Sequence, residues 1–164
     1  MPYQEQPGWA LEQIDTPALI VDLDALEYNI DKLARHFAAT NKTLRPHTKS
    51  HKTPAIAHRQ LAAGAEGVTC AKLGEAEVMA DAGIDDILIA NEIVGHQKIE
   101  RLMRLATRCD IMVAVDNASI LAQLDAAAAT HQVKPRVLVE VNIGHNRCGQ
   151  PPGSGLLDLA RSAA

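Results

Sequence analysis

The segment Arg45-Pro46-His47-Thr48-Lys49-Ser50-His51-Lys52 holds the residue types best suited to covalent chemistry. A lysine amine can form a Schiff base with a carbonyl cofactor when burial and cationic neighbours lower its pKa. An arginine, two histidines and a second lysine supply such neighbours within the segment. The residue types alone leave two interpretations open, a Schiff-base lysine or a solvated basic turn.

A second segment, Glu140-Val141-Asn142-Ile143-Gly144-His145-Asn146-Arg147-Cys148-Gly149, combines two glycines with an arginine and a cysteine. Gly144 and Gly149 allow the backbone to turn tightly. Arg147 lies between them, and its permanently cationic guanidinium can hold a phenolate or carboxylate oxygen. The alternative is an ordinary glycine-bracketed turn with a surface arginine. We interpret Cys148 as an inert thiol, because no helix begins directly after it.

Three weaker candidates come late in predicted strands or directly after them: Thr69, Asn91 and Glu92. No glycine-rich fingerprint of a Rossmann fold or a P-loop is present, so nucleotide binding has no support. Cys70, Cys109 and Cys148 are odd in number and lack CxxC spacing. This usage argues against a disulfide framework and against a zinc knuckle.

These segments are positioned by a repeated rhythm of apolar strands and amphipathic helices. We predict five strands, at residues 44–48, 68–71, 86–90, 111–115 and 136–143. An apolar run at residues 18–21 precedes a first predicted helix, with Asp24 as its N-cap. Further helices are predicted from Pro54 to Gly64, over residues 75–82 and over residues 97–107. Two more are predicted, one after Asp116 or Asn117 and one from about Leu156. This alternation predicts a parallel sheet covered by helices, of the α/β class. Both chemical segments then follow strands and lie at the carboxyl edge, where such sheets bind ligands.

The strands recur about every two dozen residues, the size of one strand–helix unit. An eight-unit barrel typically needs about 250 residues, so the 164 residues present supply about five units. Residues 156–164 form a predicted helix without a C-cap glycine. We therefore expect a partial (β/α)8 TIM-type barrel that is cut short, rather than a small open sheet.

The composition excludes several classes of protein. Hydrophobic residues make up 47% of the chain, charged residues 22% and aromatic residues 2%, which is not the composition of a disordered chain. A net charge of −4 without a basic stripe argues against nucleic acid as a partner. No run of roughly 18 apolar residues and no secretory signal is found, so a membrane partner is not expected. Three scattered thiols favour a reducing, cytoplasmic setting.

The two chemical segments are similar to motifs of the fold-type III pyridoxal-phosphate (PLP) enzymes, the alanine-racemase-like barrels. Within them, the chain most resembles the D-threonine aldolase and D-serine dehydratase group. The resemblance rests on the opening run at residues 15–30, on residues 45–52, on residues 67–76 and on the turn Gly-His-Asn-Arg-Cys-Gly at residues 144–149. It extends over essentially the whole chain, so that residues 1–164 resemble the N-terminal portion of a PLP-binding barrel domain.

The resemblance implies a PLP-dependent lyase that acts on small β-hydroxy D-amino acids. By position, Lys49 would be the Schiff-base lysine, and Arg147 would contact the 3-hydroxyl oxygen of the cofactor. His47 and Thr69 are further candidates for cofactor binding. Lys52 is the rival lysine, but in a strand Lys49 shares a face with His47 while Lys52 falls on the other face. The cofactor would act as an electron sink for bond cleavage at the substrate α-carbon.

Members of this family are considerably longer than the present chain. The part beyond it would complete the barrel and, in the aldolase and dehydratase group, would carry the ligands of a divalent metal (Mn, Mg or Zn), so no metal ligand is assigned here. In racemase relatives a partner subunit supplies a tyrosine, which neither Tyr3 nor Tyr28 matches, and a homodimer is expected for the full-length parent. Three alternatives stay open: an amino-acid racemase of the same fold, a non-catalytic PLP-binding protein, and an inactive fragment.

Overall fold

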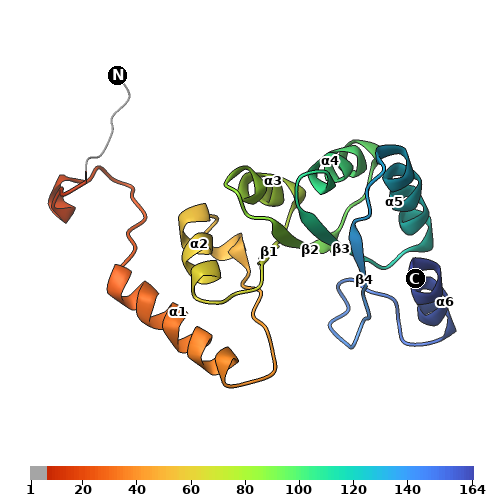
Figure 1. The fold of residues 1–164 in the computed structure, drawn as a ribbon, viewed down its shortest axis with the longest axis horizontal. Helices are drawn as coiled ribbons and strands as arrows, with labels where there is room; N and C mark the ends of the chain where they lie inside the picture. The colour runs from red at the N-terminus through yellow and green to blue at the C-terminus, as the bar shows by residue number, and fades with distance from the viewer. Residues whose placement is uncertain (1–6) are drawn as a thin grey trace.

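The computed structural model describes residues 7–164, and its centre is a parallel sheet of four strands (Figure 1). The strands are β1 (Val68–Cys70), β2 (Asp86–Glu92), β3 (Asp110–Val115) and β4 (Arg136–Val139). They lie side by side in chain order, and every neighbouring pair is parallel. The predicted α/β class and parallel sheet are confirmed.

The helices that connect the strands lie on one face of the sheet. They are α3 (Leu73–Asp81), α4 (His96–Ala106) and α5 (Ala118–His131), while α2 (Pro54–Ala62) precedes β1 and α6 (Ser154–Ala163) follows β4. Right-handed connections between neighbouring parallel strands put successive helices on the same face of a sheet. Helices α3, α4 and α5 accordingly lie along one face (Figure 1). A parallel sheet in chain order with its helices on one side forms part of a (β/α) barrel.

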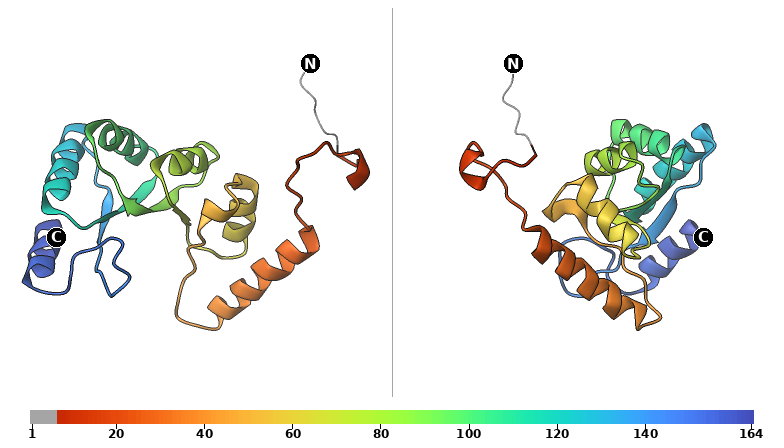
Figure 2. Two further views of the ribbon diagram at one scale, coloured as in Figure 1. Left: turned by 180° about the vertical axis from the view of Figure 1, so that it is seen from behind. Right: turned by 60° about the vertical axis from the view of Figure 1, so that its left-hand side comes forward.

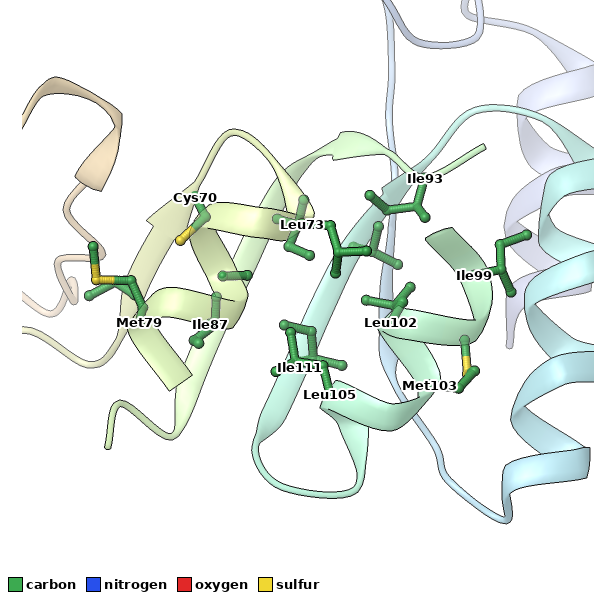
Figure 3. Packing of buried hydrophobic residues seen from close by; sticks show 14 of the residues in the cluster. Cys70, Leu73, Met79, Ile87, Ile93, Ile99, Leu102, Met103, Leu105 and Ile111 are labelled. Carbon is green, nitrogen blue, oxygen red and sulfur yellow. The ribbon is translucent and has the colours of Figure 1, made fainter. Parts of the chain in front are cut away.

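Alternating residues of the strands build the core between the sheet and these helices (Figure 3). In β2, Ile87 and Ile89 are completely buried, whereas Leu88 between them points to the other face and is half-buried. The helices contribute buried side chains to the same core, among them Leu73, Met79, Ile99, Leu102, Met103 and Leu105. The opposite face of the sheet is less covered, and Leu138 of β4 is 44% exposed there. The face that would line a barrel interior is therefore the open face of this chain.

An ion-pair network fastens the amino ends of the strands. The Arg45 guanidinium donates to both carboxylate oxygens of Asp86 at 2.8 Å. Arg136 donates to Asp86 Oδ1 at 2.9 Å and to Asp110 Oδ1 at 2.8 Å. Gly67 lies against this network, since a Cβ there would come within 2.5 Å of the Asp86 carbonyl oxygen. Three strands and the segment before β1 are thus joined at one end by charges of opposite sign.

The N-terminal part projects away from this body (Figures 1 and 2). A short 3-10 helix, η1 (Leu11–Gln13), precedes an extended stretch in which Leu19 is fully exposed. Helix α1 (Leu23–Ala38) begins after Asp22, whose Oδ1 accepts from the Ala25 N–H at 2.9 Å. The predicted N-cap, Asp24, is wrong, because Asp22 is the residue placed to satisfy a free donor of the first turn. Tyr3 lies outside the described residues.

Helix α1 touches the rest of the chain along an apolar cleft. Leu26, Ile30, Leu33 and Phe37 line this space of about 380 Å³ together with residues of α2 and the segment before it. The spacing of these four residues puts them on one face of the helix. The ion pair of Glu27 with Arg59 joins α1 to α2. Among the helices described in residues 7–164, none is both long and apolar enough to cross a membrane.

Two predicted strands differ from the structure. Residues 44–48 form a single bridge, His47 with Thr69, and not a strand. Pro46 is the reason, because it lacks the N–H that the preceding rung of the ladder requires. The last strand ends at Val139 and not at residue 143, since Val141 pairs with Gln150 of the following loop. The sheet therefore has four strands where five were predicted.

The helices match their predictions to within about two residues, the usual disagreement at helix ends. Helix α3 begins at Leu73 instead of residue 75, and α4 begins at His96 instead of residue 97. Asn117, one of the two predicted caps, accepts from the N–H groups of Ser119 and Ile120 and so begins α5. The three cysteines are free thiols.

Candidate active site

Lys49 lies on a short 3-10 helix, η2 (Thr48–Ser50), at the carboxyl edge next to β1. The Lys49 side chain is exposed, and its backbone N–H donates to His47 Nδ1 at 3.3 Å. Because Lys49 belongs to a helical turn, the strand alternation used to choose it over Lys52 does not apply, and that reasoning was wrong. The choice between the two lysines depends instead on their contacts.

The two lysines differ in their charged neighbours. Lys52 Nζ lies 3.8 Å from Glu75 Oε1, so its ammonium is paired with a carboxylate. Among residues 7–164, no carboxylate lies within 4.0 Å of the Lys49 ammonium. The two lysines of this segment thus differ in ion pairing, and Lys49 is the one whose amine is not held by a carboxylate.

Side-chain hydroxyls fasten the segment that carries Lys49 to β1. Thr48 is completely buried, and its Oγ1 donates to the Thr69 carbonyl oxygen at 3.1 Å. Thr69 Oγ1 donates to the Arg45 carbonyl oxygen at 3.2 Å, and the Thr69 N–H donates to the Pro46 carbonyl oxygen at 2.8 Å. The hydroxyl of Thr69, a predicted cofactor contact, is thus engaged within the fold.

Two histidines of this segment have lowered pKa values. Burial, followed by the nearby Lys49 ammonium, lowers the pKa of His47. Burial also lowers the pKa of His51, whose Nδ1 accepts from the Thr53 N–H at 3.0 Å. Both rings are therefore neutral at pH 7, which is the state in which a ring nitrogen can accept from a backbone N–H. The neutral His47 supports the turn at Lys49.

The loop after β4 is shaped by Gly149 and Asp116. Gly149 has φ +94°, and a Cβ there would lie 2.7 Å from the Asn142 nitrogen, so only glycine fits. Its N–H donates to Asp116 Oδ2 at 3.1 Å, and Gln150 Nε2 donates to the Asp116 carbonyl oxygen at 2.6 Å. Arg147 lies on this loop with an exposed side chain. The loop is fixed at its base, while its arginine faces solvent.

Behind Arg147, the structure gathers two carboxyl groups and a thiol. Side-chain ligand atoms of Glu92, Glu140 and Cys148 all lie within 4.8 Å of one another. A register shift in β2 brings Glu92 level with Ala114 of β3. Burial, and then hydrogen bonding to Glu92, raises the pKa of both Glu140 and Cys148, while Arg147 acts in the opposite direction on both. The raised pKa favours the protonated thiol of Cys148, and its inertness stays a prediction.

The structure brings together only some of the residues singled out in the sequence. His47, Lys49 and Thr69 share one part of the carboxyl edge. Arg147 belongs to the part formed after β4, and no hydrogen bond or ion pair in residues 7–164 joins it to the Lys49 turn. The proximity of Glu92 to Glu140 was missed, although Glu92 follows one predicted strand and Glu140 lies within another. The strand predictions were the available signal, but they do not give the register that sets these side chains level.

The fold and the edge together define a class: the chain is part of a (β/α) barrel whose polar groups gather at the carboxyl ends of its strands. Its sequence matches the family described as alanine racemase, N-terminal domain, over residues 21–164. The chain therefore belongs to this family, the fold-type III PLP barrels that its motifs resembled.

Among curated proteins, the chain is 43% identical to a D-threonine aldolase of Arthrobacter sp. over 163 residues. This match includes 99% of the chain but 43% of the relative. A 3-hydroxy-D-aspartate aldolase of Paracoccus denitrificans is 39% identical over 160 residues, 96% of the chain and 41% of the relative. The chain thus spans about two fifths of the length of these relatives.

Among solved structures, the D-threonine aldolase from Filomicrobium marinum superposes with a TM-score of 0.90 at 51% sequence identity. The superposition includes 93% of this chain and 41% of that chain. Over the superposed region, this chain therefore has the same fold as that relative.

Proposed function

We propose that this chain provides the lysine-bearing part of a PLP-dependent lyase that acts on small β-hydroxy D-amino acids. The observation that carries the proposal is the position of Lys49, held at the carboxyl edge of a parallel sheet with no carboxylate partner in the described residues. The activities named for the relatives support the substrate class, since D-threonine and 3-hydroxy-D-aspartate are both β-hydroxy D-amino acids.

The donor set on this edge fits two of the functional groups of PLP. A lysine amine can condense with an aldehyde and release one water molecule, and Lys49 Nζ is the amine available for this reaction. A guanidinium can bind a phenolate oxygen through charged hydrogen bonds, and Arg147 is exposed for this role. When bound, the cofactor supplies an electron sink for the electrons of a broken bond at the substrate α-carbon.

The remaining residues of the edge have supporting roles in this proposal. His47 holds the backbone of the Lys49 turn through its neutral ring. Asp116 fixes the base of the loop that carries Arg147. Arg147 acts to lower the pKa of Glu140, and in this proposal the Glu140 carboxylate attracts the guanidinium. Thr69 acts through the backbone of Arg45, and its proposed cofactor contact would need the hydroxyl to change partner.

A lyase is favoured over a racemase because both curated relatives described above are named as aldolases. A dehydratase would share the same substrates and the same lysine. Aldol cleavage of D-threonine gives glycine and acetaldehyde, dehydration followed by hydrolysis gives an oxo acid and ammonia, and racemisation at the α-carbon changes only the configuration there. The products therefore distinguish the three reactions.

The proposal has three further parts. Residues 1–164 form the N-terminal portion of the PLP-binding barrel domain, and the whole protein acts as a homodimer in the cytoplasm. A divalent metal takes part in the reaction with ligands from outside this chain. Metal removal with a chelator is then expected to abolish cleavage of D-threonine without removing cofactor bound at Lys49.

The test uses the 164-residue chain mixed with PLP and then reduced with borohydride. We expect a visible absorption band before reduction and, after digestion and mass spectrometry, a permanent adduct on the peptide that contains Lys49. Lys49→Ala is expected to lose the adduct, whereas the matched control Lys52→Ala keeps it. An adduct that is absent, or that is spread equally over surface lysines, contradicts the proposal.

Turnover is then measured with D-threonine and added divalent metal. Release of acetaldehyde with glycine supports the aldolase assignment. A specific Lys49 adduct with no turnover under any metal supports instead the alternative of a PLP-binding protein without catalysis.

A further inference from the structure

The segment before β1 reaches the sheet with one backbone bond fewer than a regular strand. In the parallel ladder, the bridge of His47 with Thr69 uses the Thr69 N–H and the Pro46 carbonyl oxygen, which are 2.8 Å apart. The preceding rung would need an N–H on Pro46, and proline has none. A segment that carries a reactive side chain is therefore held by an incomplete ladder.

The Thr48 hydroxyl supplies a bond at the place where this ladder ends. Thr48 is completely buried, with its Oγ1 3.1 Å from the Thr69 carbonyl oxygen and 3.4 Å from Cys70 Sγ. A hydroxyl has one proton, so when it donates to the Thr69 carbonyl it accepts from the Cys70 thiol. Burial raises the pKa of Cys70, which keeps the proton on sulfur for that purpose. The three groups form a chain from thiol to hydroxyl to carbonyl inside the protein.

The same residue anchors the turn that presents Lys49. The Thr48 carbonyl oxygen accepts from the N–H groups of His51 at 3.2 Å and Lys52 at 2.7 Å, which closes the turn around Lys49. Thr48 therefore connects the turn to β1 through its hydroxyl and closes the turn through its carbonyl oxygen. Packing alone would be satisfied by valine, which has the same shape, so the buried hydroxyl needs a separate reason.

We infer that Thr48 is the positioning residue of Lys49, because its buried hydroxyl fixes the lysine-bearing turn to the Thr69 carbonyl oxygen of β1, beside a ladder that Pro46 leaves one backbone bond short. The consequence for the cofactor rests on the proposed function, whereas the fixing of the turn does not. Thr48 does not touch the reacting atoms and acts through the backbone of its neighbour.

The experiment compares the 164-residue chain with Thr48→Val, Thr48→Ala and Thr48→Ser. Valine keeps the shape without the hydroxyl, alanine removes the hydroxyl without overpacking, and serine keeps the hydroxyl. Thr107→Val is the matched control, since the Thr107 hydroxyl donates to a backbone carbonyl at 2.7 Å but at the exposed end of α4. Far-UV circular dichroism establishes which variants are folded.

Two readouts are used. The first is hydrogen exchange of the Lys49, His51 and Lys52 amides without any cofactor, for which we expect about a fivefold acceleration in Thr48→Val and Thr48→Ala, the size of one lost buried hydrogen bond. The second is the ratio of borohydride-fixed PLP on Lys49 to that on Lys52, which we expect to fall by a similar factor. Thr48→Ser is expected to restore both values to within about twofold, and Thr107→Val to leave both unchanged.

The outcomes separate the inference from the proposed function. Unchanged exchange and an unchanged adduct ratio in a folded Thr48→Val or Thr48→Ala variant overturn the inference. Faster exchange restored by serine supports it, even if the unsubstituted chain forms no Lys49 adduct. That absence of an adduct would count against the proposed function alone.

Discussion

The two ends of the parallel sheet use charged residues in opposite ways. At the amino end, Arg45, Asp86, Arg136 and Asp110 alternate in sign, and their contacts are 2.8–2.9 Å. At the carboxyl end, the Glu92 and Glu140 carboxyl groups lie together, and the Lys49 ammonium has no carboxylate partner among residues 7–164. Satisfied ion pairs hold the strands together, whereas unpaired or like-charged groups can still gain favourable interactions with a ligand. One end of the sheet therefore stabilises the fold, and the other end is left available for function.

The largest expected effect is at the amino end. Asp86→Ala leaves Arg45 and Arg136 without their common carboxylate, and the Arg45 side chain is only 15% exposed. We expect a loss of about 3 kcal/mol in the free energy of unfolding, measured with urea and circular dichroism. The control is Asp158→Ala, which breaks an exposed pair with Arg161 and is expected to cost less than about 0.5 kcal/mol. Equal losses in the two variants would remove the distinction between the ends.

The second prediction compares one arginine at each end of the sheet. Arg147→Gln is expected to weaken PLP binding about tenfold, by loss of charged hydrogen bonds to the cofactor, with little change in stability. Arg136→Gln is the matched arginine at the amino end, and there we expect the reverse, a loss of stability with unchanged PLP affinity in the folded chain. The measurements are an absorbance titration with PLP and a urea unfolding curve for each variant. A stability loss in Arg147→Gln equal to that in Arg136→Gln would contradict the comparison.

The residues in these two predictions show which features of the sheet could be predicted from the sequence. Apolar runs and helix caps predicted the parallel sheet and placed Lys49, His47 and Arg147 at its carboxyl edge. The partnership of Asp86 with Arg136 spans 50 residues and depends on strand register, which the hydrophobic pattern does not contain. The register shift that brings Glu92 beside Glu140 is hidden for the same reason.

The error at residues 44–48 is of a different kind. Its signal, Pro46, is present in the sequence, and a proline inside a predicted strand argues against a regular strand. The preference for Lys49 over Lys52 also depended on that strand. The pairing of Lys52 with Glu75, 23 residues later in the chain, is a tertiary contact that no local spacing reports.

The third prediction concerns pH at the Lys49 turn. The folded-state pKa of His47 is lowered from the ordinary value of 6.5, so folding favours the neutral ring. The resulting stability is present above pH 6.5 and is lost as the pH falls through the lowered value, where protonated Nδ1 can no longer accept from the Lys49 N–H. Below that value we expect exchange of the Lys49 amide, corrected for its intrinsic rate, to accelerate about fivefold, the effect of losing a cap.

His47→Asn is the control for this pH effect, because an asparagine oxygen can accept the same bond without titrating. The charged groups near His47 are Lys49 and Glu75. His51, whose pKa is also lowered, keeps its own titration in the control. An acceleration of equal size in His47→Asn would assign the effect to His51.

The smallest effect is expected at the carboxyl pair. The pKa of Glu140 is raised in the fold, so stability is greatest below the ordinary glutamate value and falls as the pH rises toward the folded-state value. Glu140→Gln removes this titration, and we expect a gain of about 0.5 kcal/mol at pH 7 and a flatter dependence of stability on pH. Glu92 and Asp116 act in the same direction on Glu140, and Arg147 opposes them. Unfolding curves at several pH values test this, and a loss of stability at pH 7 would show that the Glu140 charge is balanced by Arg147.

The order of the strands has a consequence for how the chain is made. Because β1, β2, β3 and β4 lie side by side in the order in which they are synthesised, each emerging strand–helix unit finds its neighbour already present. The turn with Lys49 needs only β1 to be fixed, and β1 follows it within about two dozen residues. The loop with Arg147 has to wait for β3, which supplies Asp116 beyond its end, and for β4. On the ribosome, all residues of the lysine part of the edge are thus translated three strands before Arg147.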